Sequence, residues 1–156
     1  MEPAGLASVL QVMTEHETRL RALLAGFDRQ TLATRPPNGD WSAIENMRHA
    51  LYAEQHHIGR FIPGGLGVSP LRLPQGTHAP VTADDPRTDP AAVFDQWESI
   101  HATVCARLDL THPGLAVQLP RLLRHQQAHG RLAARALREI TGQPVRLPSA
   151  NTARRE

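Results

Sequence analysis

Four stretches of this 156-residue chain carry apolar side chains at helical spacing, and none alternates as a strand would. The four stretches are 4–27, 42–62, 90–108 and 120–141. Four helices of about 20 residues joined by loops predict an all-α fold, a four-helix bundle. We expect a single bundle domain over residues 1–142, because Gly142 and Pro144 end the last helix, and an irregular tail over residues 143–156.

A long proline-rich segment separates the second predicted helix from the third. It runs from residue 63 to residue 89 and contains Pro63, Pro70, Pro74, Pro80 and Pro86. A loop of this length within a small domain is usually functional or mobile. Asp89 and Pro90 then start the third helix, since aspartate caps a first turn and proline tolerates the first helical position.

Two histidines four residues apart mark the last predicted helix. His125 and His129 lie one turn apart on the face that carries the apolar residues Leu132, Ala133, Ala136 and Ile140. Burying an imidazole without a partner costs roughly 2–7 kcal/mol. The pair therefore needs either a metal ion, as paired helical histidines bind zinc, or a buried hydrogen-bond network.

A second motif, Trp41-Ser-Ala-Ile-Glu-Asn-Met-Arg-His49, opens the second predicted helix. Its Ser42 and Glu45 have the spacing of a capping box. Together with the later HxxxH, the motif resembles the DinB/YfiT-like family of metal-binding four-helix bundles. The resemblance covers nearly the whole chain in the order of its elements, and its specific motifs occupy residues 41–49 and 125–129.

This resemblance implies that His49, His125 and His129 together hold one divalent transition metal. Three neutral imidazoles leave a coordination position open for water or substrate, as catalytic sites do. Nitrogen ligands favour zinc or nickel here, with iron and copper as alternatives. Glu45 either caps its helix or orients the His49 ring as a carboxylate partner.

The helical angle separates His49 from the apolar stripe of its own helix by roughly 140–180°. The stripe consists of Ile44, Met47, Leu51, Ile58 and Ile62. If only the stripe faced the core, His101 on the third helix would be the better third ligand, whereas the resemblance favours His49. Turning His49 inward would displace the stripe from the bundle axis, where adjacent helices, the long loop or a two-fold partner would cover it. We therefore expect a homodimer formed through the second helix.

Composition excludes several classes of function. All 17 basic residues are arginine, which removes lysine Schiff bases and the phosphate-loop lysine. The few aromatic residues and the lack of a recognisable module argue against nucleic-acid binding. Cys105 is the only cysteine, so no intramolecular disulfide forms. No apolar run has membrane length and no signal-peptide pattern is present, so we expect a cytoplasmic protein without a membrane partner.

These features favour a metal-dependent enzyme. The family includes thiol-dependent transferases and isomerases, so the resemblance implies a transferase that joins a low-molecular-weight thiol to a small electrophile, or else a hydrolase. A bound metal would lower the pKa of a thiol or of water. Two alternatives stay open: a non-catalytic, stress-related protein that binds a metal or a small ligand, and a helical interaction module whose histidines merely pack.

Overall fold

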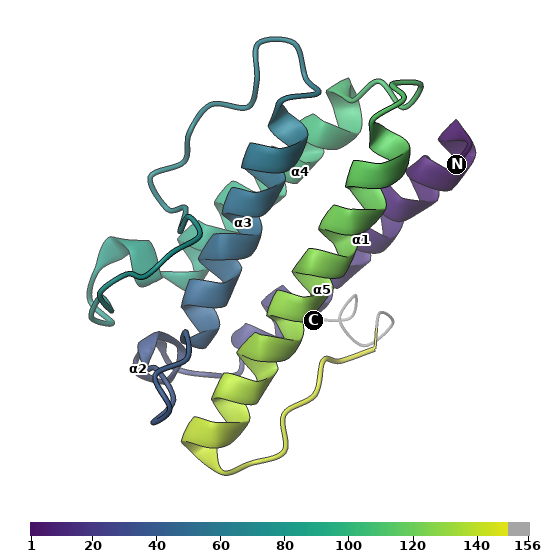
Figure 1. The fold of residues 1–156 in the computed structure, drawn as a ribbon. Helices are drawn as coiled ribbons and strands as arrows, with labels where there is room; N and C mark the ends of the chain where they lie inside the picture. Colours follow the sequence, from purple (N-terminus) through teal and green to yellow (C-terminus); the bar gives the residue numbers. More distant parts are fainter. Residues whose placement is uncertain (150–156) are drawn as a thin grey trace.

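Four long helices and one short helix make up the fold in this computed structural model, which describes residues 1–149 (Figure 1). The helices, with one 3-10 turn, are α1 Pro3–Leu24, α2 Arg29–Ala33, α3 Ala43–Gly59, η1 Pro86–Thr88, α4 Pro90–Arg107 and α5 Leu115–Thr141. Residues 1–149 contain no strand, so the predicted all-α bundle is confirmed. None of these helices is long and apolar enough to cross a membrane.

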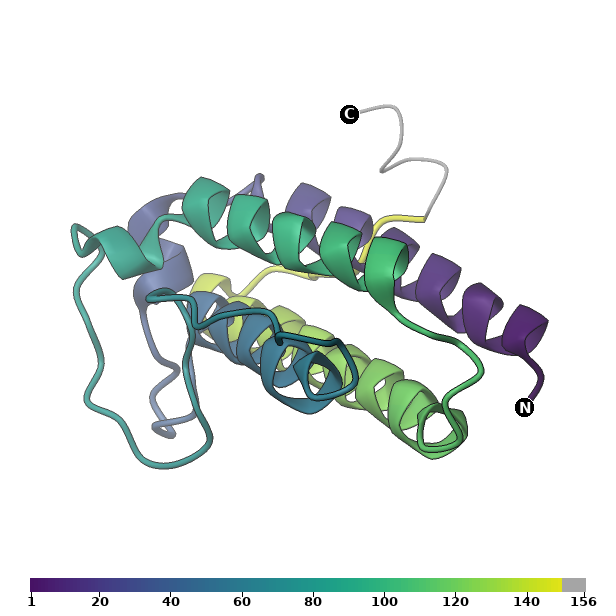
Figure 2. The ribbon, with the colours of Figure 1, turned by 90° about the horizontal axis from the view of Figure 1, so that it is seen from above.

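The long helices form two layers. α3 lies beside α5 in one layer, and α1 lies beside α4 in the other, as the view from above in Figure 2 shows. α3 also packs on α4, and α1 also packs on α5, which closes the bundle. The short α2 sits across one end, against α3 and α5.

Two apolar clusters fill the bundle, one toward each end. The cluster near α2 is built around Trp97 and Phe94, and the other is built around Met13 and Leu115. Between the two clusters, the helices contribute buried polar residues instead: His16, Glu17, Glu54, His101 and Gln126. The core is therefore divided by a polar layer, which the helical stripes in the sequence do not reveal.

The apolar stripe of α3 is buried inside the chain. Ile44, Met47, Leu51 and Ile58 are fully buried and Ile62 is nearly so, because α3 is covered by α4, α5, α2 and the 63–89 loop. Of the alternatives for this stripe, cover by adjacent parts of the chain is the one observed, and an exposed apolar patch on α3 is not present. Homodimerisation stays a prediction, but this stripe provides no surface for it.

The start of the last helix and the presence of α2 differ from the sequence prediction. α5 starts at Leu115, five residues before Pro120, because Leu115 and Leu119 both gain burial in the core. Pro120 therefore lies inside the helix, where it removes one backbone hydrogen bond near the N-terminus. The short α2 was not predicted, although Asp28 caps it by accepting a hydrogen bond from the Thr31 backbone N–H at 2.7 Å.

The chain leaves α5 through Gly142, whose φ of 67° is the left-handed conformation that favours glycine. Residues 143–149 are irregular, yet Val145 is buried against the core. Arg138 donates to the carbonyl oxygen of Val145, and Arg19 donates to that of Pro148. The remainder of the predicted tail, residues 150–156, lies outside the described residues.

Candidate metal centre

Three histidines from two helices meet between α3 and α5. His49 of α3 and His125 and His129 of α5 each place a ring nitrogen so that all three nitrogens lie within 4.8 Å of one another. No other group of three histidine, cysteine or acidic residues in the described part of the chain meets this geometry. The three residues named from the sequence are thus brought together, and His101 is not among them.

The 63–89 loop explains how His49 is enclosed on a face turned away from the apolar stripe. The loop covers that face, leaving His49 only 2% exposed. The Arg48 guanidinium donates to the carbonyl oxygens of Leu71 and Arg72, at 2.8 and 3.2 Å. The backbone N–H of Leu73 donates to the carbonyl oxygen of Arg48. Backbone rather than a fifth helix therefore encloses the histidine face of α3.

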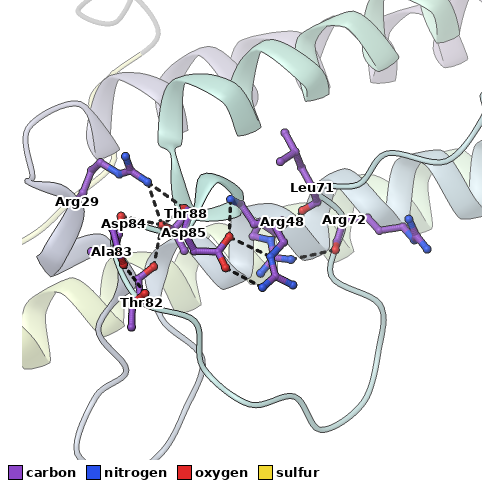
Figure 3. A network of polar contacts seen from close by, with 10 residues as sticks. Arg29, Arg48, Leu71, Arg72, Thr82, Ala83, Asp84, Asp85 and Thr88 are labelled. Atoms are coloured by element: carbon purple, nitrogen blue, oxygen red, sulfur yellow. Dashed lines mark hydrogen bonds and ion pairs between the residues drawn. The ribbon is translucent and has the colours of Figure 1, made fainter.

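The second half of the 63–89 loop is hydrogen-bonded to α2, at one end of the bundle. The Thr88 hydroxyl lies within hydrogen-bond distance of the carbonyl oxygens of Ala83 and Asp85, and Arg29 of α2 donates to the Asp85 carbonyl at 3.0 Å (Figure 3). The Asp85 carboxylate forms an ion pair with Arg87 at 2.7 Å. The loop is therefore a structural cover over α3 with defined anchors at both ends.

Carbonyl oxygens orient two of the three imidazole rings. His49 Nδ1 lies 2.8 Å from the carbonyl oxygen of Leu73, and His129 Nδ1 lies 2.8 Å from Oδ1 of Asn46. The Asn46 amide is itself fixed, because its Nδ2 donates to the Ser42 carbonyl at 2.9 Å. Since a carbonyl oxygen only accepts, both Nδ1 atoms carry hydrogen, and Nε2 of each ring keeps its lone pair for a metal ion.

The third ring has a nitrogen without a partner. Nδ1 of His125 is buried, and it is the only buried side-chain nitrogen or oxygen in residues 1–149 that makes no hydrogen bond. A buried polar atom left unpaired is costly, and coordination is one way to satisfy an imidazole nitrogen. This orphaned atom, beside two oriented rings, fits a bound divalent metal better than it fits simple packing.

The rings are held in the neutral state that coordination requires. Burial lowers the pKa of His49, His125 and His129 below the ordinary histidine value. For His129 the pKa falls to about 4, because burial is joined by repulsion from His125 and His49. Three imidazoles with free lone pairs at neutral pH are a suitable donor set for zinc or nickel.

Glu45 caps α3 and does not orient His49. The Ser42 hydroxyl oxygen accepts from the Glu45 backbone N–H, and Glu45 accepts from the Ser42 N–H at 2.9 Å, so the predicted capping box is confirmed. Arg35 also binds the Glu45 carboxylate through two hydrogen bonds, at 2.9 and 2.7 Å. Burial raises the pKa of Glu45, but these hydrogen bonds outweigh it and the net shift is downward.

Two cavities flank the three histidines. One, of about 330 Å³, is lined by His129, Asn46, Trp41 and Arg135 among others. The other, of about 410 Å³, is lined by His125, Arg60 and Arg121 among others. Trp41 contacts the His49 ring edge-on, with centroids 5.2 Å apart, and so forms a wall beside the site.

Sequence reasoning missed the groups that orient the rings. Asn46 precedes His49 by three residues on α3, so its position one turn away was the available signal. The Leu73 carbonyl left no signal, because it belongs to the backbone of an irregular loop.

Comparison with known proteins agrees with the fold and the motifs. No curated protein and no solved structure matches the chain. The model of the DinB superfamily matches residues 13–141, which include most of α1, all of α2 to α5 and the three histidines. The chain therefore belongs to the DinB superfamily.

Proposed function

We propose that this protein is a metal-dependent enzyme that transfers a small thiol to an electrophile at the centre formed by His49, His125 and His129. The observation that carries the proposal is the convergence of three ligand nitrogens within 4.8 Å. The rings of His49 and His129 are oriented through Nδ1, as metal-ligating histidines are.

The three histidines would hold the ion, which would supply Lewis acidity and lower the pKa of a coordinated thiol or water. The chain's own residues fix the arrangement. Leu73 and Asn46 hold two rings in place, and the loop excludes water from the His49 side. Three protein ligands would leave a coordination position that a substrate atom could occupy.

The charge around the flanking cavities favours an acidic substrate. Arg60 and Arg121 are exposed in the cavity that reaches His125, and neither pairs with a carboxylate in the described part of the chain. Arg135 lines the cavity beside His129, where it pairs with Glu139 at 3.1 Å. Guanidinium groups bind carboxylates and phosphates with two parallel hydrogen bonds. A thiol or an electrophile that carries carboxylate groups suits these cavities.

Turnover by the metal-loaded protein tests this proposal. The protein is loaded with Zn²⁺ or Ni²⁺, and the loss of free thiol is followed for a panel of thiols and electrophiles. We expect turnover by the wild type and none above background by His129→Ala. The control is His56→Ala, because His56 lies two turns after His49 on α3 but is exposed. Stoichiometric metal without turnover would instead indicate the non-catalytic metal-binding role.

A further inference from the structure

A second group of titratable residues lies in the polar layer of the core, apart from the metal centre. Its hub is Glu54 of α3, which is 1% exposed. Glu54 accepts hydrogen bonds from Trp97 Nε1 at 3.2 Å, from Gln126 Nε2 at 3.0 Å and from His101 Nδ1 at 2.7 Å. With these three donors, the Glu54 carboxylate is satisfied within the protein.

His101 is also satisfied on both ring nitrogens. Its Nε2 lies 2.8 Å from the Thr14 hydroxyl oxygen, and that hydroxyl donates its hydrogen to the carbonyl oxygen of Leu10. With the Thr14 hydrogen on the Leu10 carbonyl, Nε2 donates to the hydroxyl oxygen, and the raised pKa of His101 favours this doubly protonated ring, which forms an ion pair with Glu54. Burial lowers the pKa of His101, but the hydrogen bond and charge of Glu54 outweigh it and raise the pKa overall.

Glu17 lies next to this pair but has no partner of its own. Its side chain points into a groove of about 330 Å³ between α1 and α4, which it lines together with Thr14, Thr18 and Cys105. The residue is only 7% exposed, and its carboxyl oxygens, which keep some contact with solvent in the groove, make no hydrogen bond or ion pair within residues 1–149. A carboxyl group that is largely shielded from water and has no partner favours binding a proton or a cation from the groove.

Two hydroxyl oxygens beside Glu17 act as acceptors. The Thr18 hydroxyl donates its hydrogen to the carbonyl oxygen of Thr14 at 3.0 Å, just as the Thr14 hydroxyl donates to Leu10. The Thr18 oxygen therefore has both lone pairs free for the groove, and the Thr14 oxygen, which accepts from His101, has one. A ligand that brings hydrogen-bond donors suits these two oxygens and the Glu17 carboxyl group.

The charges facing Glu17 leave a net negative potential in the groove. Glu54 and His101 compensate each other, and Arg21 at the rim is bound by Asp95 and Glu98, at 2.7 and 2.8 Å. Burial, followed by the charge of Glu54, raises the pKa of Glu17 to about 8. At neutral pH the carboxyl group therefore holds a proton that a cation can displace.

We propose that the groove between α1 and α4 binds a primary ammonium group, with the Glu17 carboxylate as counter-ion and the hydroxyl oxygens of Thr14 and Thr18 as hydrogen-bond acceptors. The cation replaces the proton on Glu17. Ala102 and Cys105 of α4 line the same groove and leave room for a short alkyl chain beside the ammonium group. This site is separate from the histidine centre and does not depend on a bound metal.

Calorimetric titration of the full-length protein with n-butylammonium at pH 7 tests the proposal. We expect binding with release of about 0.9 proton, because a group with a pKa near 8 is about 90% protonated at this pH. The release is measured from the dependence of the enthalpy on the ionisation enthalpy of the buffer. The neutral probe n-butanol and the probe tetramethylammonium, which has no N–H, should bind at least about tenfold more weakly.

Three variants locate the site. Glu17→Gln should weaken n-butylammonium binding at least about tenfold and abolish proton release. Ala102→Leu keeps the carboxyl group but fills the groove, and it should weaken binding as well. Glu2→Gln removes an exposed carboxylate near the start of the same helix and should change nothing. Equal binding of n-butanol, unchanged binding by Glu17→Gln or no binding of n-butylammonium by the wild type would overturn the proposal.

Discussion

Histidines lie inside the bundle at two places, and the hydrogen-bond partners of their ring nitrogens differ between the two. At the centre between α3 and α5, His49 and His129 donate through one ring nitrogen to a carbonyl oxygen, and their other nitrogens converge with His125. In the polar layer, His101 uses both nitrogens on Thr14 and Glu54.

The direction in which the pKa of each histidine shifts follows from these different partners. Burial without a carboxylate lowers the pKa of His129 to about 4, whereas the neighbouring carboxylate of Glu54 raises that of His101 despite burial. Burial alone therefore does not identify a ligand. A buried histidine is available to a metal when its partners are neutral acceptors and one nitrogen remains free.

The largest expected effect is on metal content, which should depend on the histidines between α3 and α5 and not on His101 in the polar layer. His125→Ala or His129→Ala should remove bound metal, because two remaining imidazoles form a weak site. His101→Ala should retain one metal per chain, since its ring lies in the other cluster. Metal analysis of the purified variants measures this. Retention of stoichiometric metal by His129→Ala, or its loss from His101→Ala, would contradict the assignment.

The next effect concerns stability and belongs to the polar layer. Glu54→Gln leaves the protonated His101 without its counter-ion, and breaking a buried pair in this way costs about 3–5 kcal/mol. Urea unfolding at pH 7 gives the change in the free energy of unfolding. The control Glu98→Gln breaks an exposed pair with Arg21 and should cost less than about 1 kcal/mol. A Glu54→Gln variant as stable as this control would refute the buried ion pair.

Glu17 should make the free energy of unfolding fall as pH rises from the acidic range to about 8. Its folded pKa of about 8 exceeds the unfolded value, so the folded state binds the extra proton between the two pKa values, and the stability this proton provides is lost across that range and levels off above pH 8. From the two pKa values, the loss between pH 6 and pH 9 is about 2–3 kcal/mol. The groups that face Glu17 are Glu54, His101, Glu98 and Arg21.

Unfolding of Glu17→Gln at both pH values checks this expectation. Glutamine resembles the protonated acid and does not titrate, so the difference between pH 6 and pH 9 should shrink by that amount. An unchanged difference would mean that Glu17 is not the responsible group.

The smallest expected effect tests the orientation of His129. Asn46→Ala removes the oxygen that accepts from His129 Nδ1, and loss of such a partner weakens metal affinity by about 10–100-fold. Asn46→Asp keeps an acceptor at the same place and should retain most of the affinity. Competition with a chromogenic chelator measures both variants. Equal affinity of the alanine variant and the wild type would show that the ring needs no such support.

The sequence predicted the parts of this molecule that depend on local geometry. Four apolar stripes predicted the bundle, and the spacing of His125 and His129 places them one turn apart in any helix. The motif around His49 pointed to the superfamily, which the match over residues 13–141 confirmed. The capping box of Ser42 and Glu45 is equally local.

The features that the sequence did not predict depend on what packs against a helix. The helical angle of His49 suggested exposure of one face of α3, because no periodic signal shows that an irregular loop covers the other face. The pairing of Glu54 with His101 joins residues 47 positions apart, and the sequence singled out His101 only as an alternative metal ligand. Pro120 suggested a helix start because the gain from burying Leu115 and Leu119 is a tertiary effect.

The hydrogen bond from His49 to the carbonyl oxygen of Leu73 can form only after the 63–89 loop has closed onto α3. His125 and His129 are arranged as soon as α5 forms, whereas His49 receives its partner only when a loop 24 residues downstream closes onto α3. Closing a loop costs entropy that a helix turn does not. The centre is therefore completed late in folding. Local opening of this loop would release His49 while the helices stay intact, so hydrogen exchange at the Leu73 amide reports on the readiness of the centre.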